Sequence, residues 1–300
     1  MPISEDALRE KFEKLNIWEQ GGQRAPHKPL LLLLALGQLT RGVEVLEFRS
    51  IEGPLTELLR EFGPSRSSYH PEYPFWRLQN DGIWVITASR GMRHRQSNSD
   101  PPKSELREAN ASGGFSEDIC RALTANPMFA SELAQRLLSA HFPETLHQDI
   151  LDAVGLDGAF AANVRVRRDP LFRGQVLAAY GYKCAVCELD LRLGNLTIGL
   201  EAAHVRWHQA RGPDSVENGI ALCSLHHKVF DLGAFTIAPD FRLLVSEKVH
   251  GTGQLEHVLL RHHGQTIGQP ADPNHRPHAQ YLAWHRREVF KEGVRYLDER

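Results

Sequence analysis

The stretch from residue 184 to residue 227 constrains this chain most, because it holds two pairs of metal-ligand residues with equal spacing. Two residues separate Cys184 from Cys187, and two separate Cys223 from His226. Zn2+ prefers thiolate and imidazole ligands, and a two-residue spacer lets one tight turn deliver both members of a pair. We predict that these four residues hold a structural zinc ion with complete coordination. The alternative is a redox Cys-x-x-Cys pair, which would need a thioredoxin-like strand and helix around it.

Residues suited to hydrolysis lie between these pairs. His204 ends a mostly apolar run, 196–203, that predicts a strand, and Asn218 lies in the loop that follows. A histidine with a near-neutral pKa can take a proton from water while a divalent cation faces a phosphate. Asn218 would then hold the strand that carries this base.

A short helix is predicted at 224–232, where a glycine ends it. His227 and Asp231 lie four residues apart in it, so they share a face and are candidates to hold one divalent cation. His226 points about 100° away from His227 and is therefore available to the zinc ion. The alternative is that His204 and His227 are ordinary interior histidines with satisfied hydrogen bonds.

The order and spacing of these residues resemble those of the HNH endonucleases, in the form that carries a zinc knuckle. The resemblance implies a ββα-metal finger in which His204 is the general base, Asn218 the orienting residue and His227 a ligand of the catalytic metal. Many members place an acidic or second imidazole ligand directly before the base, whereas this chain has Ala203 there. We expect Asp231 to complete the site for a divalent cation such as Mg2+, Mn2+, Co2+ or Ni2+.

Composition sets broader limits. The chain has 300 residues with 41% hydrophobic content, enough for two domains with cores of their own. No apolar run is long enough to cross a bilayer, and the first residues are acidic and amphipathic, unlike a signal peptide. We therefore expect no membrane partner and a cytoplasmic location, where thiols stay reduced.

Periodicity predicts an α+β chain of two domains, 1–160 and 161–300, the first of them a mixed domain of helices and a small sheet. A wholly apolar segment at 30–39 predicts a buried helix. The Asp81-Gly82 pair lies between two aromatic and aliphatic runs, which indicates a β-hairpin. Residues 98–117 are polar and rich in glycine and proline, and we expect them to form a loop.

The formal net charge of −2 means that positive charge must be clustered if the partner is a nucleic acid. One cluster is Arg93-His94-Arg95-Gln96, whose arginine and glutamine types can read guanine and adenine edges in a groove. Another is the run of arginines at 165–173. Both clusters can equally be solvated loops, which is the commoner outcome for charge runs.

Two loops of the first domain combine cationic groups with stiff apolar ones. One contains Arg24, His27 and Lys28 between prolines, and the other contains Tyr73 and Pro74 shortly after a His-Pro pair. We expect such loops to form a small apolar cup with a positive rim. The alternative is that these aromatic residues and prolines belong to the core.

The segments Arg-Ala-Pro-His-Lys-Pro-Leu-Leu and His-Pro-Glu-Tyr-Pro-Phe-Trp-Arg-Leu resemble the sulfur-binding domain of phosphorothioation-dependent, type IV, McrA-like restriction endonucleases. Those proteins join this domain to a C-terminal HNH domain. The resemblance implies that the partner is double-stranded DNA in which sulfur replaces a non-bridging phosphate oxygen. It also implies that Tyr73 and Pro74 form the sulfur pocket, with charge around it from Arg24, His27 and Lys28. Arg77 joins the DNA-binding candidates at a position where a smaller residue would line the cup.

The resulting expectation is a modification-dependent restriction endonuclease. Because one HNH site cuts one strand, a double-strand break would need a homodimer or two successive visits. A first alternative keeps the nuclease but reads a modified base such as methylcytosine, flipped into an aromatic pocket. A second alternative is a zinc-stabilised DNA-binding protein whose hydrolytic site has decayed, as Ala203 permits.

Overall fold

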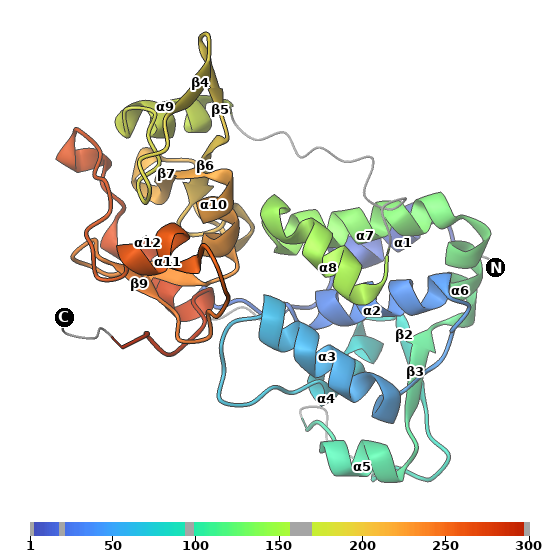
Figure 1. The fold of residues 1–300 in the computed structure, drawn as a ribbon. Coiled ribbons are helices and arrows are strands. Elements are labelled where there is room, and N and C mark those ends of the chain that lie inside the picture. The colour runs from blue at the N-terminus through green and yellow to red at the C-terminus, as the bar shows by residue number, and fades with distance from the viewer. Residues whose placement is uncertain (1–2, 18–21, 94–98, 157–169, 297–300) are drawn as a thin grey trace. The chain divides into compact units, whose positions relative to one another are not determined.

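The computed structural model describes residues 3–17, 22–93, 99–156 and 170–296 (Figure 1). The chain divides into two units, one made of 1–21 and 25–165 and the other of 22–24 and 166–300. The domain boundary expected near residue 160 lies outside the described residues. No helix in the described ranges is long and apolar enough to cross a membrane.

The first unit is mostly helical (Figure 1). Its helices are α1 (Glu5–Glu13), α2 (His27–Thr40), α3 (Phe48–Phe62), α4 (Glu72–Arg77), α5 (Lys103–Glu108), α6 (Glu117–Ala125), α7 (Pro127–His141) and α8 (His147–Val154). Short 3-10 turns follow α4 at Leu78–Asp81 and precede α8 at Glu144–Leu146.

Helix α2 lies at the centre of this unit. Its residues from Pro29 to Gly37 are all buried, and it packs against α3, α4, α6, α7 and α8. A helix that is apolar on every side is stable only when it is surrounded. The predicted buried helix at 30–39 is thus confirmed, and it is the element against which these five helices pack.

A three-stranded antiparallel sheet covers part of this core. Its strands are β1 (Leu46–Glu47), β3 (Ser112–Phe115) and β2 (Trp84–Thr87), in that spatial order. Strand β3 comes from the segment expected to be a polar loop, so that expectation was wrong. Its two glycines admit close neighbours, since a Cβ on Gly113 would lie 2.5 Å from the indole of Trp84.

The hairpin expected around Asp81-Gly82 was also wrong. The residues before it form α4 and a 3-10 turn, and β2 pairs with β3 instead. Phe75 and Leu78, three residues apart, are both fully buried, so helical spacing decides the structure here. Gly82, with φ 65°, ends the 3-10 turn rather than a hairpin.

The second unit combines small sheets with short helices. Its elements are α9 (Pro170–Ala179), β4 (Leu191–Leu193), β5 (Leu196–Ile198), β6 (Leu200–His204), β7 (Gly219–Cys223), α10 (Ser224–Asp231), β8 (Phe235–Ile237), β9 (Leu243–Val245), α11 (Leu255–Val258) and α12 (Ala279–Glu288). Four 3-10 turns complete it, at His208–Ala210, Val216–Asn218, Leu260–His262 and Pro273–His275.

Strands β6 and β7 with helix α10 form a ββα finger. The strands pair antiparallel from Leu200 opposite Cys223 to His204 opposite Gly219, and α10 begins directly after β7. The single strand expected at 196–203 is divided at Gly199, whose φ is 64°, and its first part pairs with β4. The mixed helical first unit, this finger and its cysteines confirm the predicted fold class.

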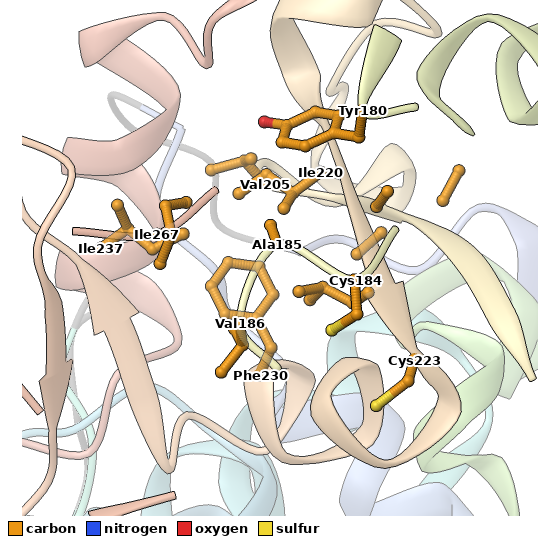
Figure 2. Packing of buried hydrophobic residues seen from close by; sticks show 14 of the residues in the cluster. Tyr180, Cys184, Ala185, Val186, Val205, Ile220, Cys223, Phe230, Ile237 and Ile267 are labelled. Carbon is orange, nitrogen blue, oxygen red and sulfur yellow. The ribbon is translucent and has the colours of Figure 1, made fainter. Parts of the chain in front are cut away.

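A hydrophobic core holds the finger together (Figure 2). Phe230 of α10, Ile220 of β7 and Val186 belong to it, and so do Cys184 and Cys223. The two cysteines therefore sit where apolar packing already fixes the backbone.

Gly37 offers a direct test of the packing around α2. A Cβ at this position would lie 2.0 Å from the carbonyl oxygen of Val154, at the end of α8. We expect Gly37→Ala to destabilise the protein by about 1–3 kcal/mol, because backbone has to move to admit the methyl group. Thermal unfolding of the full chain measures this.

Gly174 in α9 is the matched control, because a Cβ there meets nothing within 4 Å. We expect Gly174→Ala to leave the melting temperature unchanged or to raise it, as alanine favours a helix over glycine. Equal melting temperatures for the two variants would contradict the close approach of α8 to α2.

Candidate functional site

The four predicted zinc ligands lie together. Their ligand atoms are all within 4.8 Å of one another. Nδ1 of His226 lies 3.1 Å from Sγ of Cys223 and 3.6 Å from Sγ of Cys184, and the sulfurs of Cys187 and Cys223 are 3.9 Å apart. Ligands of one tetrahedral zinc ion stand roughly 3.5–3.8 Å from each other. The donor set and its spacing therefore fit a single zinc ion.

The orientation of His226 agrees with this arrangement. Its Nε2 lies 2.8 Å from the carbonyl oxygen of Val258 and donates to it, which leaves the lone pair on Nδ1 directed toward the thiols. In the first pair, the backbone N–H of Glu188 donates to the carbonyl of Cys184, and Glu188 adopts φ 58°. This tight turn brings Cys187 back beside Cys184.

Asn218 ties the loop after β6 to the start of β7. Its side-chain oxygen accepts from the backbone N–H of Arg206 at 2.8 Å. Its amide nitrogen donates to the carbonyls of Arg206 at 3.0 Å and Pro213 at 2.9 Å. Asn218 is fully buried, so these bonds are shielded from water. The backbone that follows His204 is therefore held in place.

His204 ends β6 between an aromatic ring and a carboxylate. Its ring stacks on Phe172 of α9, with centroids 4.1 Å apart, and its Nε2 lies 2.7 Å from Oδ1 of Asp214. With Asp214 accepting the Nε2 proton, Nδ1 is the nitrogen that can act as a base. Gly219, opposite His204, makes room, since a Cβ there would lie 2.3 Å from Val176 and 3.2 Å from Phe172.

His227 projects from α10 between two carboxylates. Its Nδ1 lies 2.6 Å from Glu201 of β6, and its Nε2 lies 3.2 Å from Asp231. Burial acts to lower the pKa of His227, but Asp231 and Glu201 outweigh burial and raise it to about 9. The surroundings of this imidazole therefore favour positive charge.

Two of these carboxylates were not found by sequence reasoning. Asp214 lies in a polar loop, and nothing local distinguishes it from other loop carboxylates. Glu201 could have been found, because it lies two residues before Ala203 in a predicted strand. Side chains two residues apart on a strand share a face, so Glu201 lies on the face where Ala203 lacks a ligand. Within the described part of the chain, one group of three or more histidine, cysteine, aspartate or glutamate residues has ligand atoms close enough to hold one ion. It is the zinc cluster.

A pocket of about 1140 Å³ opens in the first unit. It contains five of the residues expected to bind DNA, namely His27, Lys28, Tyr73, Pro74 and Arg77. It also contains residues that the sequence did not single out, among them Arg66, Asn80 and Asp100.

The pocket combines an apolar wall with arginines. The ring of Tyr73 stacks on His70, with centroids 4.6 Å apart, and the guanidinium carbon of Arg77 lies 5.0 Å from the centre of the Tyr73 ring. Arg77 also binds Asp100, with Nε 2.9 Å from Oδ1. Burial lowers the pKa of His27 to about 4, and the positive charge of Arg66 acts in the same direction. His27 is thus neutral at neutral pH.

Two other cations have structural partners. Lys28 donates to the carbonyl of Asn16 at 2.7 Å and to Asp81 at 2.6 Å. Arg24 groups with the second unit, where its guanidinium lies 3.9 Å from the ring centre of Trp207 and donates to the carbonyl of Glu288 at 2.9 Å. Arg24 does not line the pocket of the first unit.

The predicted groove-reading cluster is only partly described. The backbone N–H of Arg93 donates to Glu105 at 3.0 Å. His94, Arg95 and Gln96 lie outside the described residues, as do the arginines at 165–168.

Two family models match separate regions of the chain. Residues 5–159 match the ScoMcrA-like DNA sulfur-binding domain, and residues 184–238 match an HNH endonuclease. With the ββα finger and the zinc knuckle, these matches define an HNH-type DNA endonuclease preceded by a sulfur-binding domain. The first model spans more than half of the chain, and the chain belongs to the ScoMcrA-like sulfur-binding domain family.

Several solved structures are similar to the chain. The sulfur-binding domain of ScoMcrA complexed with phosphorothioated DNA is 22% identical, with a TM-score of 0.43 over 49% of this chain and 94% of that one. The corresponding SprMcrA complex is 19% identical, with a TM-score of 0.42 over 51% and 95%. The type IV phosphorothioation-dependent restriction endonuclease ScoMcrA is 22% identical, with a TM-score of 0.41 over 49% of this chain and 32% of that one. No curated protein matches the chain.

Cysteine replacement tests the zinc knuckle. We expect the purified protein to contain one zinc ion per chain. We expect Cys223→Ser to lose this ion and the second unit to unfold, because one of the four zinc ligands lies at the start of α10. Metal analysis and thermal unfolding measure both effects. Cys120→Ser, in α6 of the first unit, is the control and should keep its zinc. A zinc-free wild-type protein as stable as the zinc-bound form would contradict this site.

Proposed function

We propose that this chain is a modification-dependent restriction endonuclease. Its first unit binds double-stranded DNA that carries a phosphorothioate, and its second unit hydrolyses a phosphodiester bond nearby. The observation that supports this most is the pocket lined by Tyr73 and Pro74, in a region that matches a DNA sulfur-binding domain. The HNH finger in the same chain supplies a hydrolytic site.

The chemistry of the pocket suits sulfur. Sulfur is larger than oxygen, more polarizable and a weaker hydrogen-bond acceptor, so an apolar wall loses less by desolvating it. Tyr73 and Pro74 supply such a wall, and neutral His27 adds no charge to it. Arg66 and Arg77 line the same pocket and would meet the negative charge of the DNA backbone. Lys28 would act mainly by holding the pocket's shape.

In the second unit, His204 would take a proton from the attacking water through Nδ1. Asp214 holds the ring by its Nε2 proton, and Asn218 holds the backbone behind it. His227, with its carboxylate neighbours, offers nitrogen and oxygen donors that fit a divalent cation such as Mg2+, Mn2+, Co2+ or Ni2+. When bound, that cation would stabilise the charge that develops on the phosphate and the leaving oxygen.

The zinc knuckle has a different part. Three thiolates and one imidazole would complete the tetrahedral coordination of a zinc ion, which would leave no position for water or phosphate. We propose that zinc is structural only. Reduced thiols of this kind suit the cytoplasm, which we propose as the location. Because one HNH site cuts one strand, we also propose that a double-strand break uses a homodimer or a second visit.

Replacement of the general base tests the hydrolytic step. We expect His204→Ala to lower the rate of nicking of a phosphorothioated plasmid by about 100-fold or more, because general-base catalysis is lost. Binding of the same DNA should be unchanged. His208→Ala is the control, since its ring lies 6.2 Å from that of His204 and has no assigned part in the reaction. Normal nicking by His204→Ala would rule out the assigned base.

Replacement of the pocket wall tests recognition. We expect Tyr73→Ala to lower the affinity for a phosphorothioated duplex about tenfold, a loss of about 1.4 kcal/mol, and to leave weak binding of an unmodified duplex unchanged. Fluorescence anisotropy with three duplexes of one sequence, carrying sulfur, methylcytosine or neither, measures this. Tyr296→Ala, at an exposed position, is the control. A preference of the wild-type protein for the methylated duplex would instead favour a base-reading domain.

A further inference from the structure

Glu201 lies on the same face of β6 as Ala203, the position at which this chain lacks the expected metal ligand. Side chains two residues apart on a strand project from the same face, so Glu201 and Ala203 share one. Ala203 is fully buried and has no donor atom. From the same face, Oε2 of Glu201 reaches within 2.6 Å of Nδ1 of His227. The strand thus presents to His227, from position 201, the carboxylate that position 203 does not provide.

The two carboxylates beside His227 differ in their access to solvent. The side chain of Glu201 is 35% exposed, whereas that of Asp231 is 2% exposed. A cation that acts on a phosphodiester must keep coordination positions open to water and to phosphate. Glu201, which lies on the Nδ1 side of His227, has this access. Asp231, which lies on the Nε2 side, is buried.

Glu201 is also held in a way that suits a ligand. The hydroxyl of Ser224, the first residue of α10, donates to Oε1 of Glu201 at 2.9 Å. That bond occupies one carboxylate oxygen and directs the other toward His227. A partner that holds a ligating carboxylate in this manner is typical of metal sites in proteins.

We propose that Glu201 and Nδ1 of His227 are the protein ligands of the divalent cation, and that Asp231 is a positioning residue. Asp231 accepts the Nε2 proton of His227 and fixes the ring, as a carboxylate commonly does behind a ligating histidine. The sequence pattern had suggested Asp231 as the ligand. The greater exposure of Glu201 favours Glu201 as the ligand and Asp231 as the residue that positions His227. This inference rests on the proposed function, since it names the ligands of that same site.

Manganese binding to the zinc-loaded full-length protein tests the proposal without any measurement of cleavage. Isothermal titration with Mn2+ is expected to give an affinity at least tenfold weaker for Glu201→Gln than for the wild-type protein. Asp231→Asn keeps an oxygen that can accept the Nε2 proton, so its affinity should fall less. Glu256→Gln, an exposed position in α11, is the control and should bind as the wild type does. Zinc content and melting temperature show that each variant is folded.

A second measurement avoids variants altogether. Anomalous diffraction from wild-type crystals grown with Mn2+ should show a peak between Glu201 and Nδ1 of His227. A peak between Nε2 and Asp231, or full Mn2+ affinity in Glu201→Gln together with its loss in Asp231→Asn, would overturn the proposal. The same result would leave the nuclease function intact if the wild type still cuts DNA. Glu201-dependent Mn2+ binding in a protein that cuts no DNA would instead overturn the proposed function alone.

Discussion

The second unit brings metal-ligand residues from two separated segments into one Cys3His cluster that fits a zinc ion. Cys223 directly precedes α10 and His226 lies in the first turn of that helix, so a zinc ion held by this cluster would fix where the helix begins and how it is rotated. His227 then points away from zinc and toward Glu201 of β6. In the proposed function, the position of the hydrolytic site would therefore follow from a structural metal that takes no part in the chemistry.

A second tie acts at the opposite end of the same strand pair. There Asn218 binds the backbone on both sides of the loop that follows His204. One end of the β6 and β7 pair lies at the Cys3His cluster, and the other end is held by the buried amide of Asn218. His204 and His227 are thus carried by backbone that has little freedom, which is the preorganisation that electrostatic catalysis requires. The net charge of −2 describes the whole chain, whereas the pocket of the first unit is lined by Arg66 and Arg77, with Asp100 paired to Arg77.

Features set by local spacing could be predicted from the sequence. The zinc ligands follow from two short pairs, and the buried helix α2 follows from an unbroken apolar run. Features set by contacts between distant residues could not be predicted. Glu201 meets His227 across 26 residues, and Asp214 meets His204 across 10. The Asp81-Gly82 pair was ambiguous, because the same residues can end a 3-10 turn or join two strands. Arg24 is a further case, since its loop composition says nothing of its stacking on Trp207.

The central claim is that the chain cuts DNA because that DNA carries sulfur. Its most direct test is parallel digestion of two plasmids of one sequence, with and without phosphorothioate linkages, by the zinc-loaded protein with each of Mg2+, Mn2+, Co2+ and Ni2+. The account predicts cleavage of the phosphorothioated plasmid and none of the unmodified plasmid. Equal cleavage of both, or cleavage of neither with any of these ions, would contradict it.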